Sequence, residues 1–189
     1  MQKSGGHDKL KSDKKRRSAY MKRIARFEKV SFDRFLIDWK DTFHTEEGVK
    51  EIYEAISLPK RATKGSAGYD FYSPLSFELA PRETIKIPTG IRVYIEDGWV
   101  LKCYPRSGLG FKYRLQMNNT VGIIDSDYYE SDNEGHIFAK ITNDSNENKI
   151  IEMKQGEGFM QGIFVEYGIT FDDEANEQRN GGFGSTTKR

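Results

Sequence analysis

The stretch TIKIPTGIRVYIEDGWVLKCYPRSGLG, residues 84–110, decides the fold class of this chain. It contains three short runs rich in Ile, Val and Tyr, over 84–88, 91–96 and 99–104, and Gly or Pro lies between each run and the next. Short β-branched and aromatic runs that are broken by turn residues are typical of antiparallel strands. The stretch therefore predicts an antiparallel sandwich or barrel.

Short runs of β-branched and aromatic residues, separated by turn residues, also occur on both sides of this stretch. Further strands are expected over 69–73, 122–124, 136–143, 149–153 and 159–167. About eight strands of this kind suit a jelly roll. No helical pattern of useful length follows residue 67, which excludes Rossmann and P-loop folds in spite of the 18 glycines. We therefore expect an all-β jelly roll.

The residues before this region follow a different pattern. A short strand is expected over 27–31, and two amphipathic helices follow it, with Ser31 as N-cap of the first. Their apolar stripes consist of Phe32, Phe35, Leu36 and Trp39, and of Val49, Ile52, Tyr53 and Ile56. We expect a helical insert over 32–57, within a domain over 27–178, whose stripes serve as core contacts.

Length and composition narrow the class of protein. The 189 residues suit one domain of about 150 residues plus an appendage. No apolar run approaches the roughly 18 to 20 residues that cross a bilayer, and no secretory signal is visible, so a cytoplasmic protein without a membrane partner is expected. One cysteine, Cys103, and three scattered histidines, His7, His44 and His136, predict neither disulfides nor a zinc site.

Charge is unevenly distributed along the chain. Residues 1–26 contain ten Lys or Arg and two Asp, a local net charge of +8, whereas the whole chain has +1. Such an arm could bind nucleic acid through counterion release, but it lacks interleaved aromatics and any motif. We expect a solvated arm over 1–26 and no specific nucleic-acid partner. Two origins stay open for it, a native tail and a vector-derived leader.

Four turn-like segments carry polar residues that packing does not need. They are SAGYD (66–70), PRSGLG (105–110), NTVGIIDSDYY (119–129) and RNGGFGSTT (179–187). PRSGLG offers a guanidinium, a hydroxyl and glycine-freed N–H groups, which suit a polyphosphate. Asp70 and Asp125 lie between apolar residues. One of these carboxylates could hold a hydrated Mg²⁺ and the other could activate a water.

These segments, with GEGFMQGIFV (156–165) between the third and the last, resemble the five motifs of trimeric dUTPases. They occur in the family's order over 62–186. The resemblance implies a jelly-roll (β-clip) subunit, a homotrimer, and Mg²⁺-dependent hydrolysis of dUTP to dUMP and pyrophosphate. It also implies a cytoplasmic enzyme of bacterial or phage origin.

The resemblance also assigns roles to residues. Asp70 would hold Mg²⁺ through water, and Asp125 would activate the water that attacks the α-phosphate. Asn119 would read the uracil edge, and Tyr128 would pack on the deoxyribose and exclude a 2′-hydroxyl. The phosphate chain would be bound by Arg106, Ser107, Gly108 and Gln161. A mobile lid over 179–189 would contribute Arg179, Phe183, Gly184, Ser185 and Thr186, with Phe183 stacked on uracil.

Two features depart from the minimal family pattern. They are the helical insert and a loop over 130–134. Their added surface leaves open a regulatory protein partner as a second, non-catalytic role. The related dCTP deaminases are an alternative enzyme, since they share the fold and parts of the second and third motifs. The segments GIIDSDY and GGFGST favour hydrolysis.

Overall fold

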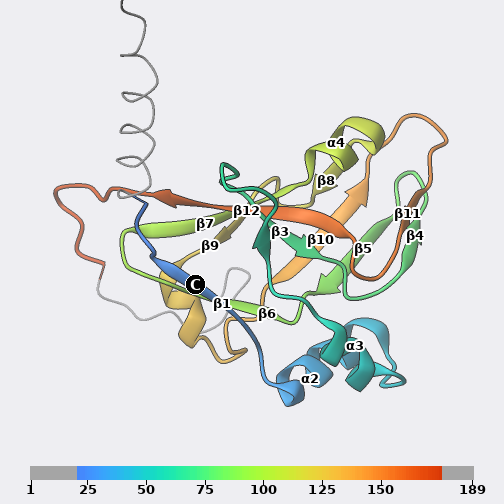
Figure 1. Ribbon diagram of the computed structural model, residues 1–189, viewed down its shortest axis with the longest axis horizontal. Coiled ribbons are helices and arrows are strands. Elements are labelled where there is room, and N and C mark those ends of the chain that lie inside the picture. Colours follow the sequence, from blue (N-terminus) through green and yellow to red (C-terminus); the bar gives the residue numbers. More distant parts are fainter. Residues whose placement is uncertain (1–20, 176–189) are drawn as a thin grey trace, which may run out of the picture.

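The computed structural model describes residues 21–175 (Figure 1). Most of the basic arm and all five expected lid residues, Arg179, Phe183, Gly184, Ser185 and Thr186, lie outside the described residues. Within 21–175, no helix has both the length and the apolar character needed to cross a membrane.

Short antiparallel strands make up most of the regular secondary structure in the described residues. The strands are β1 (Ala25–Lys29), β2 (Lys60–Arg61), β3 (Tyr69–Tyr72), β4 (Phe77–Leu79), β5 (Thr84–Pro88), β6 (Ile91–Ile95), β7 (Trp99–Pro105), β8 (Leu115–Met117), β9 (Gly122–Ile124), β10 (Phe138–Asn143), β11 (Ile151–Met153) and β12 (Gly158–Glu166). The helices are α2 (Phe32–Phe43), α3 (Val49–Ala55), α4 (Ser107–Tyr113) and the 3₁₀ helix η1 (Ser126–Glu130).

Two larger sheets and two strand pairs enclose one core. The strand order is β2-β3-β12-β7-β9 in the larger sheet and β5-β10-β8 in the smaller, with β1 paired to β6 and β11 to β4. Fully buried side chains from both sheets, including Phe71, Leu101, Ile141 and Phe159, pack together between them. The expected all-β jelly-roll class is confirmed.

Alternation along the strands explains why they form. In β6, Ile91, Val93 and Ile95 are buried, whereas Tyr94 between them is exposed. Successive side chains of a strand point to opposite faces of a sheet, so this alternation buries one face of β6 against the core. The period of two is visible in the sequence itself.

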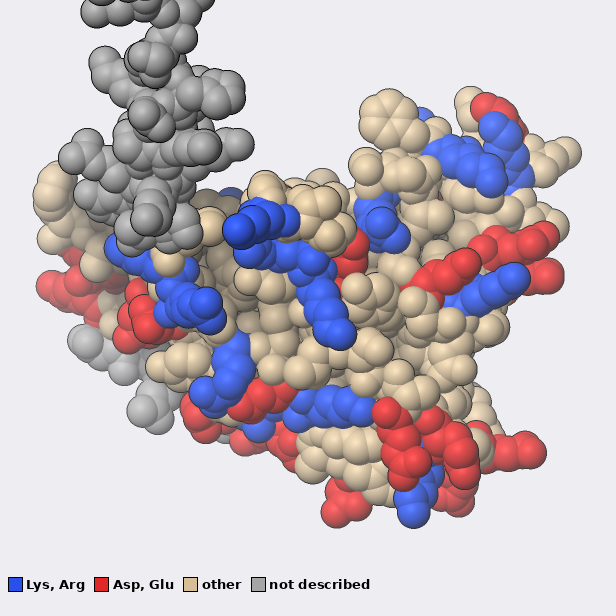
Figure 2. Space-filling model, in the orientation of Figure 1, with Lys and Arg blue, Asp and Glu red and all other residues tan. Residues whose placement is uncertain are grey.

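The helical insert forms as expected and has a small core of its own. The Ser31 hydroxyl accepts a hydrogen bond from the Arg34 N–H at the start of α2. Val30, Phe35, Trp39 and Val49 are buried together between α2 and α3. Both helices lie at one end of the molecule, the lower edge in Figure 1, and acidic side chains are frequent along that edge (Figure 2).

The structure corrects several expectations. One short helix after residue 67, α4 over Ser107–Tyr113, was not expected. Only Leu109 and Tyr113 of its seven residues pack against the core, and both are half-buried, so the apolar stripe is too short to indicate a helix in the sequence. The first strand runs over Ala25–Lys29, two residues earlier than expected, because pairing with Ile91–Ile95 of β6 sets its register. The strands β2, β4 and β8, two or three residues long, were not expected.

Candidate active site

Three expected site residues meet on neighbouring strands of the larger sheet. Gln161 on β12 pairs in register with Asp70 on β3 and with Tyr104 on β7. Arg106 directly follows β7, and its Nε atom lies 3.3 Å from Oδ1 of Asp70. We call Asp70, Arg106 and Gln161 the Asp70 cluster. Residues of the first, second and fourth motifs thus lie together within a single chain.

Arg106 crosses β12 at a glycine. Its backbone N–H donates to the Phe159 carbonyl at 3.1 Å, and its Nη1 atom donates to the Gly158 carbonyl at 3.3 Å. A Cβ atom on Gly158 would lie 2.7 Å from that Nη1 atom, closer than real contacts allow. Gly158 therefore gives the guanidinium room to lie over the strand, beside Asp70.

Ser107 and Gly108 occupy the first turn of α4 rather than the loop that the sequence indicated. Both residues are exposed. The first N–H groups of an α-helix have no carbonyl partner within the helix. Next to Arg106, this turn offers the hydrogen-bond donors and the positive charge that phosphate oxygens attract.

Asn119 is exposed in the turn between β8 and β9, two strands that belong to different sheets. The next residue, Thr120, has φ of 64°, and its N–H donates to the Met117 carbonyl at 2.8 Å. A β-branched residue rarely adopts this left-handed conformation, and such strain persists only where the surroundings fix it. The backbone of this turn therefore presents a fixed set of polar groups beside Asn119.

Asp125 and Tyr128 follow β9, the strand after this turn. Asp125 is half-buried between β9 and η1, and Tyr128 within η1 is only 6% exposed. The Tyr128 hydroxyl donates to the His136 carbonyl at 2.8 Å and accepts from the Asn133 side-chain amide at 2.8 Å. Sequence reasoning missed Asn133 and His136, because no motif marks a residue whose role is to hold a hydroxyl.

Asp125 does not lie beside the Asp70 cluster of its own chain. Ile124 pairs with Leu101 on β7, so the next residue, Asp125, lies level with Val100. Arg106 is six positions further along the chain, and a strand rises about 3.3 Å per residue, which places the two backbones about 20 Å apart. One chain therefore holds two separate parts of the expected site.

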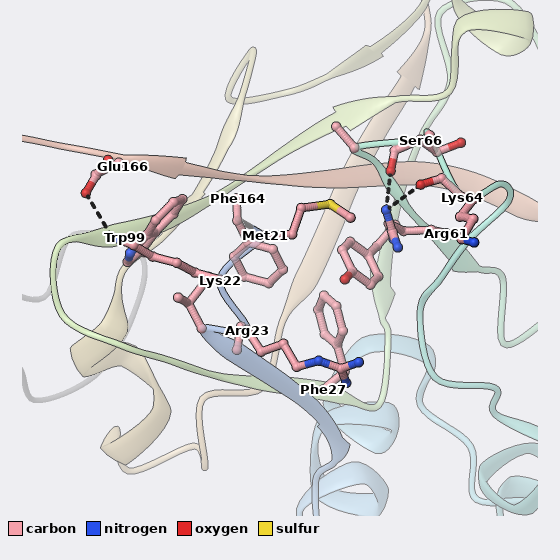
Figure 3. Close-up of a pocket in the computed structure, with 15 residues that line it drawn as sticks. Met21, Lys22, Arg23, Phe27, Arg61, Lys64, Ser66, Trp99, Phe164 and Glu166 are labelled. Atoms are coloured by element: carbon pink, nitrogen blue, oxygen red, sulfur yellow. Dashed lines mark hydrogen bonds and ion pairs between the residues drawn. The ribbon is translucent and has the colours of Figure 1, made fainter. Parts of the chain in front are cut away.

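An open groove of about 990 Å³ lies beside the first motif (Figure 3). Arg61 donates to the backbone carbonyls of Lys64 at 3.3 Å and Ser66 at 3.0 Å, and so folds the segment that leads to Asp70. Phe27 and Phe164 line the groove, whereas Asp125 and Tyr128 do not. Tyr69 of β3 also lines the groove, whereas no residue of the third motif does.

The residues around Asp70 suit a metal ion that keeps most of its water ligands. Among residues 21–175, no group of three or more His, Cys, Asp or Glu side chains could hold a metal ion. Asp70 is a single carboxylate with a side chain 17% exposed. Mg²⁺ keeps several waters and takes other ligands from substrate phosphates, so a lone carboxylate next to a phosphate site fits it.

Comparisons with known proteins show the family of this chain. The family model described as dUTPase matches residues 54–187. The deoxyuridine 5'-triphosphate nucleotidohydrolase of Lactococcus lactis is 44% identical over 134 residues, which cover 69% of this chain and 88% of that protein. The enzyme of the same name from Haemophilus influenzae is 40% identical over 140 residues, 70% of this chain and 88% of its own.

Solved structures give the same result for the fold. The crystal structure of the dUTPase from Streptococcus mutans has a TM-score of 0.56 at 32% identity, and covers 76% of this chain and 97% of its own. A mutant dUTPase from phage phi11 of S. aureus, described with a structural Mg(II) ion, has a TM-score of 0.57 at 20% identity, which supports the fold alone. It covers 82% of this chain and 98% of its own.

Proposed function

The chain belongs to the dUTPase family, and from this premise we propose how its residues share the hydrolysis of dUTP. The activity is that of a dUTP diphosphatase, which releases dUMP and pyrophosphate. The curated relatives carry this name, and none of those given above is a dCTP deaminase. The residue roles, the cofactor and the assembly form the proposal.

The Asp70 cluster binds the phosphate chain. Arg106 contributes a planar guanidinium that can pair with two phosphate oxygens at once, and the first turn of α4, with Ser107 and Gly108, donates further hydrogen bonds. Gln161 lies in register with Asp70 and adds an amide. Mg²⁺, held by Asp70 through its water shell, neutralises charge on the phosphate oxygens when it is bound.

The third motif binds the nucleoside and performs the proton transfer. Asn119 and the backbone of the turn between β8 and β9 pair with the uracil edge, and Tyr128 packs on the deoxyribose. Asp125 accepts a proton from the attacking water, which then meets the α-phosphorus in line with the leaving pyrophosphate. Positioning and charge neutralisation supply most of the rate in phosphoryl transfer, so a carboxylate is a sufficient base.

The separation of Asp125 from Arg106 carries the proposal for assembly. Because about 20 Å lies between them in one chain, a dUTP molecule bound by Arg106 needs Asp125 from another copy. A closed ring of three copies would make three equivalent sites, each with the Asp70 cluster of one chain and the third motif of its neighbour. The segment over 179–189 would cover each site as a lid.

Mixing two inactive variants tests this sharing. Arg106→Ala homotrimers lack the phosphate ligand, and Asp125→Asn homotrimers lack the base, so each should be nearly inactive. When equal amounts are refolded together, three quarters of random trimers are mixed, and each mixed trimer has one site with both residues intact. We expect about a quarter of wild-type activity, measured as pyrophosphate release.

A matched mixture provides the control. In the mixture of Asp125→Asn with Asn119→Ala, every chain has a defect in the third motif. Each site takes its whole third motif from one chain, so no mixed trimer regains an intact site. The pyrophosphate release should therefore stay at the level of the parent variants. If the first mixture, shown by mass to contain mixed trimers, is no more active than its parents, the sharing of sites between chains is wrong.

The cellular setting is a smaller part of the proposal. The named relatives come from bacteria and a phage, which supports the cytoplasm of a bacterial or infected cell as the place where dUTP is hydrolysed. A regulatory protein partner stays a prediction of the sequence.

A further inference from the structure

The two features that depart from the family pattern, the helical insert and the loop over 130–134, are bound to each other. The carboxylate of Glu134 accepts hydrogen bonds from the Ser31 N–H at 2.7 Å and from the Ser31 hydroxyl at 2.5 Å. Ser31 is also the N-cap of α2. The end of the loop is therefore tied to the first residue of the insert.

A second connection joins the insert to the residue after the loop. His136 is fully buried, and its Nδ1 atom lies 2.5 Å from Oδ2 of Asp38 in the middle of α2. Its Nε2 atom accepts the Gly90 N–H at 2.8 Å. An accepting Nε2 carries no proton, so the proton of a neutral ring is on Nδ1 and is donated to Asp38.

Asp38 is an anion in this arrangement. Burial alone raises the pKa of its carboxyl, but the hydrogen bonds from His136 and Arg34 outweigh burial and hold that pKa below the ordinary value. Arg34 donates to Asp38 from the previous turn of α2, with its Nε atom at 2.9 Å. The His136 ring is thus fixed between a charged acceptor on α2 and a backbone donor before β6.

The loop that these contacts hold is the one that surrounds the Tyr128 hydroxyl. The His136 carbonyl accepts from this hydroxyl, and the Asn133 side chain donates to it. Between them, Gly135 has φ of +68°, and a Cβ atom there would lie 2.7 Å from the Tyr128 carbonyl oxygen. The backbone of the loop therefore lies directly against Tyr128.

We propose that the helical insert positions Tyr128 through the 130–136 loop, with Asp38 and Glu134 as positioning residues that set the preference for deoxyribose over ribose. This inference rests on the proposed role of Tyr128 in reading the sugar. Ser31 and Asp38 lie before the matched family region, 54–187, whereas Glu134 and His136 lie within it, so the contacts join the insert to the family domain. A 2′-hydroxyl is excluded by lack of room, and displacement of the ring by about 1 Å would provide that room.

Selectivity measurements on two variants test the proposal. Asp38→Ala removes the acceptor for His136, and Glu134→Ala removes the half-buried carboxylate that accepts from Ser31. For both, we expect the ratio of kcat/KM for dUTP to that for UTP to fall by about tenfold, through a lower KM for UTP. The kcat for dUTP should stay within about threefold, since the water and its base are untouched.

Control variants separate positioning from a general loss of stability. Val49→Ala weakens the small core of the insert but leaves both connections in place, so the ratio should not change. Asp38→Asn keeps an oxygen that can accept from His136 and should retain most of the selectivity. Tyr128→Phe removes the hydroxyl that the loop holds, so in this background Asp38→Ala should change the ratio no further.

The outcomes distinguish this inference from the proposed function. If Tyr128→Ala leaves the dUTP over UTP ratio unchanged, the assigned role of Tyr128 is wrong. If Tyr128→Ala changes the ratio but neither Asp38→Ala nor Glu134→Ala does, the insert does not position the tyrosine. An equal loss of selectivity in Val49→Ala would also overturn the proposal, because it would show that insert stability alone controls the ratio.

Discussion

Arg106 and Asp70 form an ion pair, with 3.3 Å between Nε and Oδ1, across the two strands that flank β12. The arginine side chain is 44% exposed, so solvent weakens the pair, and a triphosphate can compete with the carboxylate for the guanidinium. The same carboxylate would hold Mg²⁺ through water. Binding of the substrate and of the metal should therefore be coupled at Asp70.

Removal of the Asp70 charge should weaken the response to Mg²⁺. For Asp70→Asn, we expect the Mg²⁺ concentration at half-maximal activity to rise by about tenfold or more, because the amide attracts metal-bound waters less strongly. A titration of dUTP hydrolysis against Mg²⁺ measures this. Glu78→Gln, an exposed carboxylate on β4, is the matched control and should titrate like the wild type. An unchanged midpoint for Asp70→Asn would exclude this residue as the metal's partner.

Neutralisation of Asp125 should affect catalysis more than binding. Asp125→Asn keeps the shape of the side chain but cannot accept a proton, so we expect kcat to fall by about a hundredfold or more while dUTP binding stays within about tenfold. Single-turnover kinetics and calorimetry measure the two quantities. Asp127→Asn, in the exposed part of η1, is the comparison and should keep its kcat. An intact kcat in Asp125→Asn would place the base elsewhere.

Stability should decrease in mild acid because of His136. Burial lowers the pKa of His136 below its ordinary value of 6.5, and the hydrogen bond to Asp38 offsets only part of that effect. Below about pH 6.5, His136 therefore binds a proton in the unfolded chain but stays neutral in the folded chain. The contribution of neutral His136 to the free energy of unfolding is complete above pH 6.5. It declines as the pH falls towards the pKa of His136 in the folded protein, by at most about 1.4 kcal/mol per pH unit.

Urea unfolding at pH 7.5 and pH 5.5 measures this decline. Asp38 does not contribute in that interval, because its pKa lies below 3.8 in the folded protein. His136→Asn, which keeps a donor towards Asp38 but has no group that titrates, should be less stable overall and lose less stability between the two pH values. An equal loss in the wild type and this variant would assign the pH dependence to other groups.

Cys103 should resist chemical modification in the folded protein. Its side chain is buried on β7, and burial raises the pKa of the thiol to about 12. Only the thiolate reacts quickly with alkylating agents. We expect iodoacetamide at pH 8 to leave folded protein unlabelled for hours and to label one site rapidly in 6 M guanidinium, as measured by mass. Rapid labelling of the folded chain would contradict the burial of this strand.

The sequence by itself determined the longer strands and the helices of the insert, but not the short strands β2, β4 and β8. Two local patterns in the sequence indicate these elements. They are the alternation of Ile91, Val93 and Ile95 and the spacing of Phe35 and Trp39 in α2, and all five side chains are buried in the structure. Such patterns are readable because each strand or amphipathic helix buries one face. α4 was not predicted, because only two of its seven residues, Leu109 and Tyr113, pack against the core, and both stay half-buried.

Only the tertiary structure decided which parts of the site meet. Asp70, Arg106 and Gln161 come together because β12 pairs with both β3 and β7, and Asp125 is kept away from them by the register of β9 on β7. The bond between Asp38 and His136 joins residues 98 positions apart. Contacts over such distances arise from sheet pairing and packing of the whole chain, whereas a motif records only the residue types that each segment brings to them.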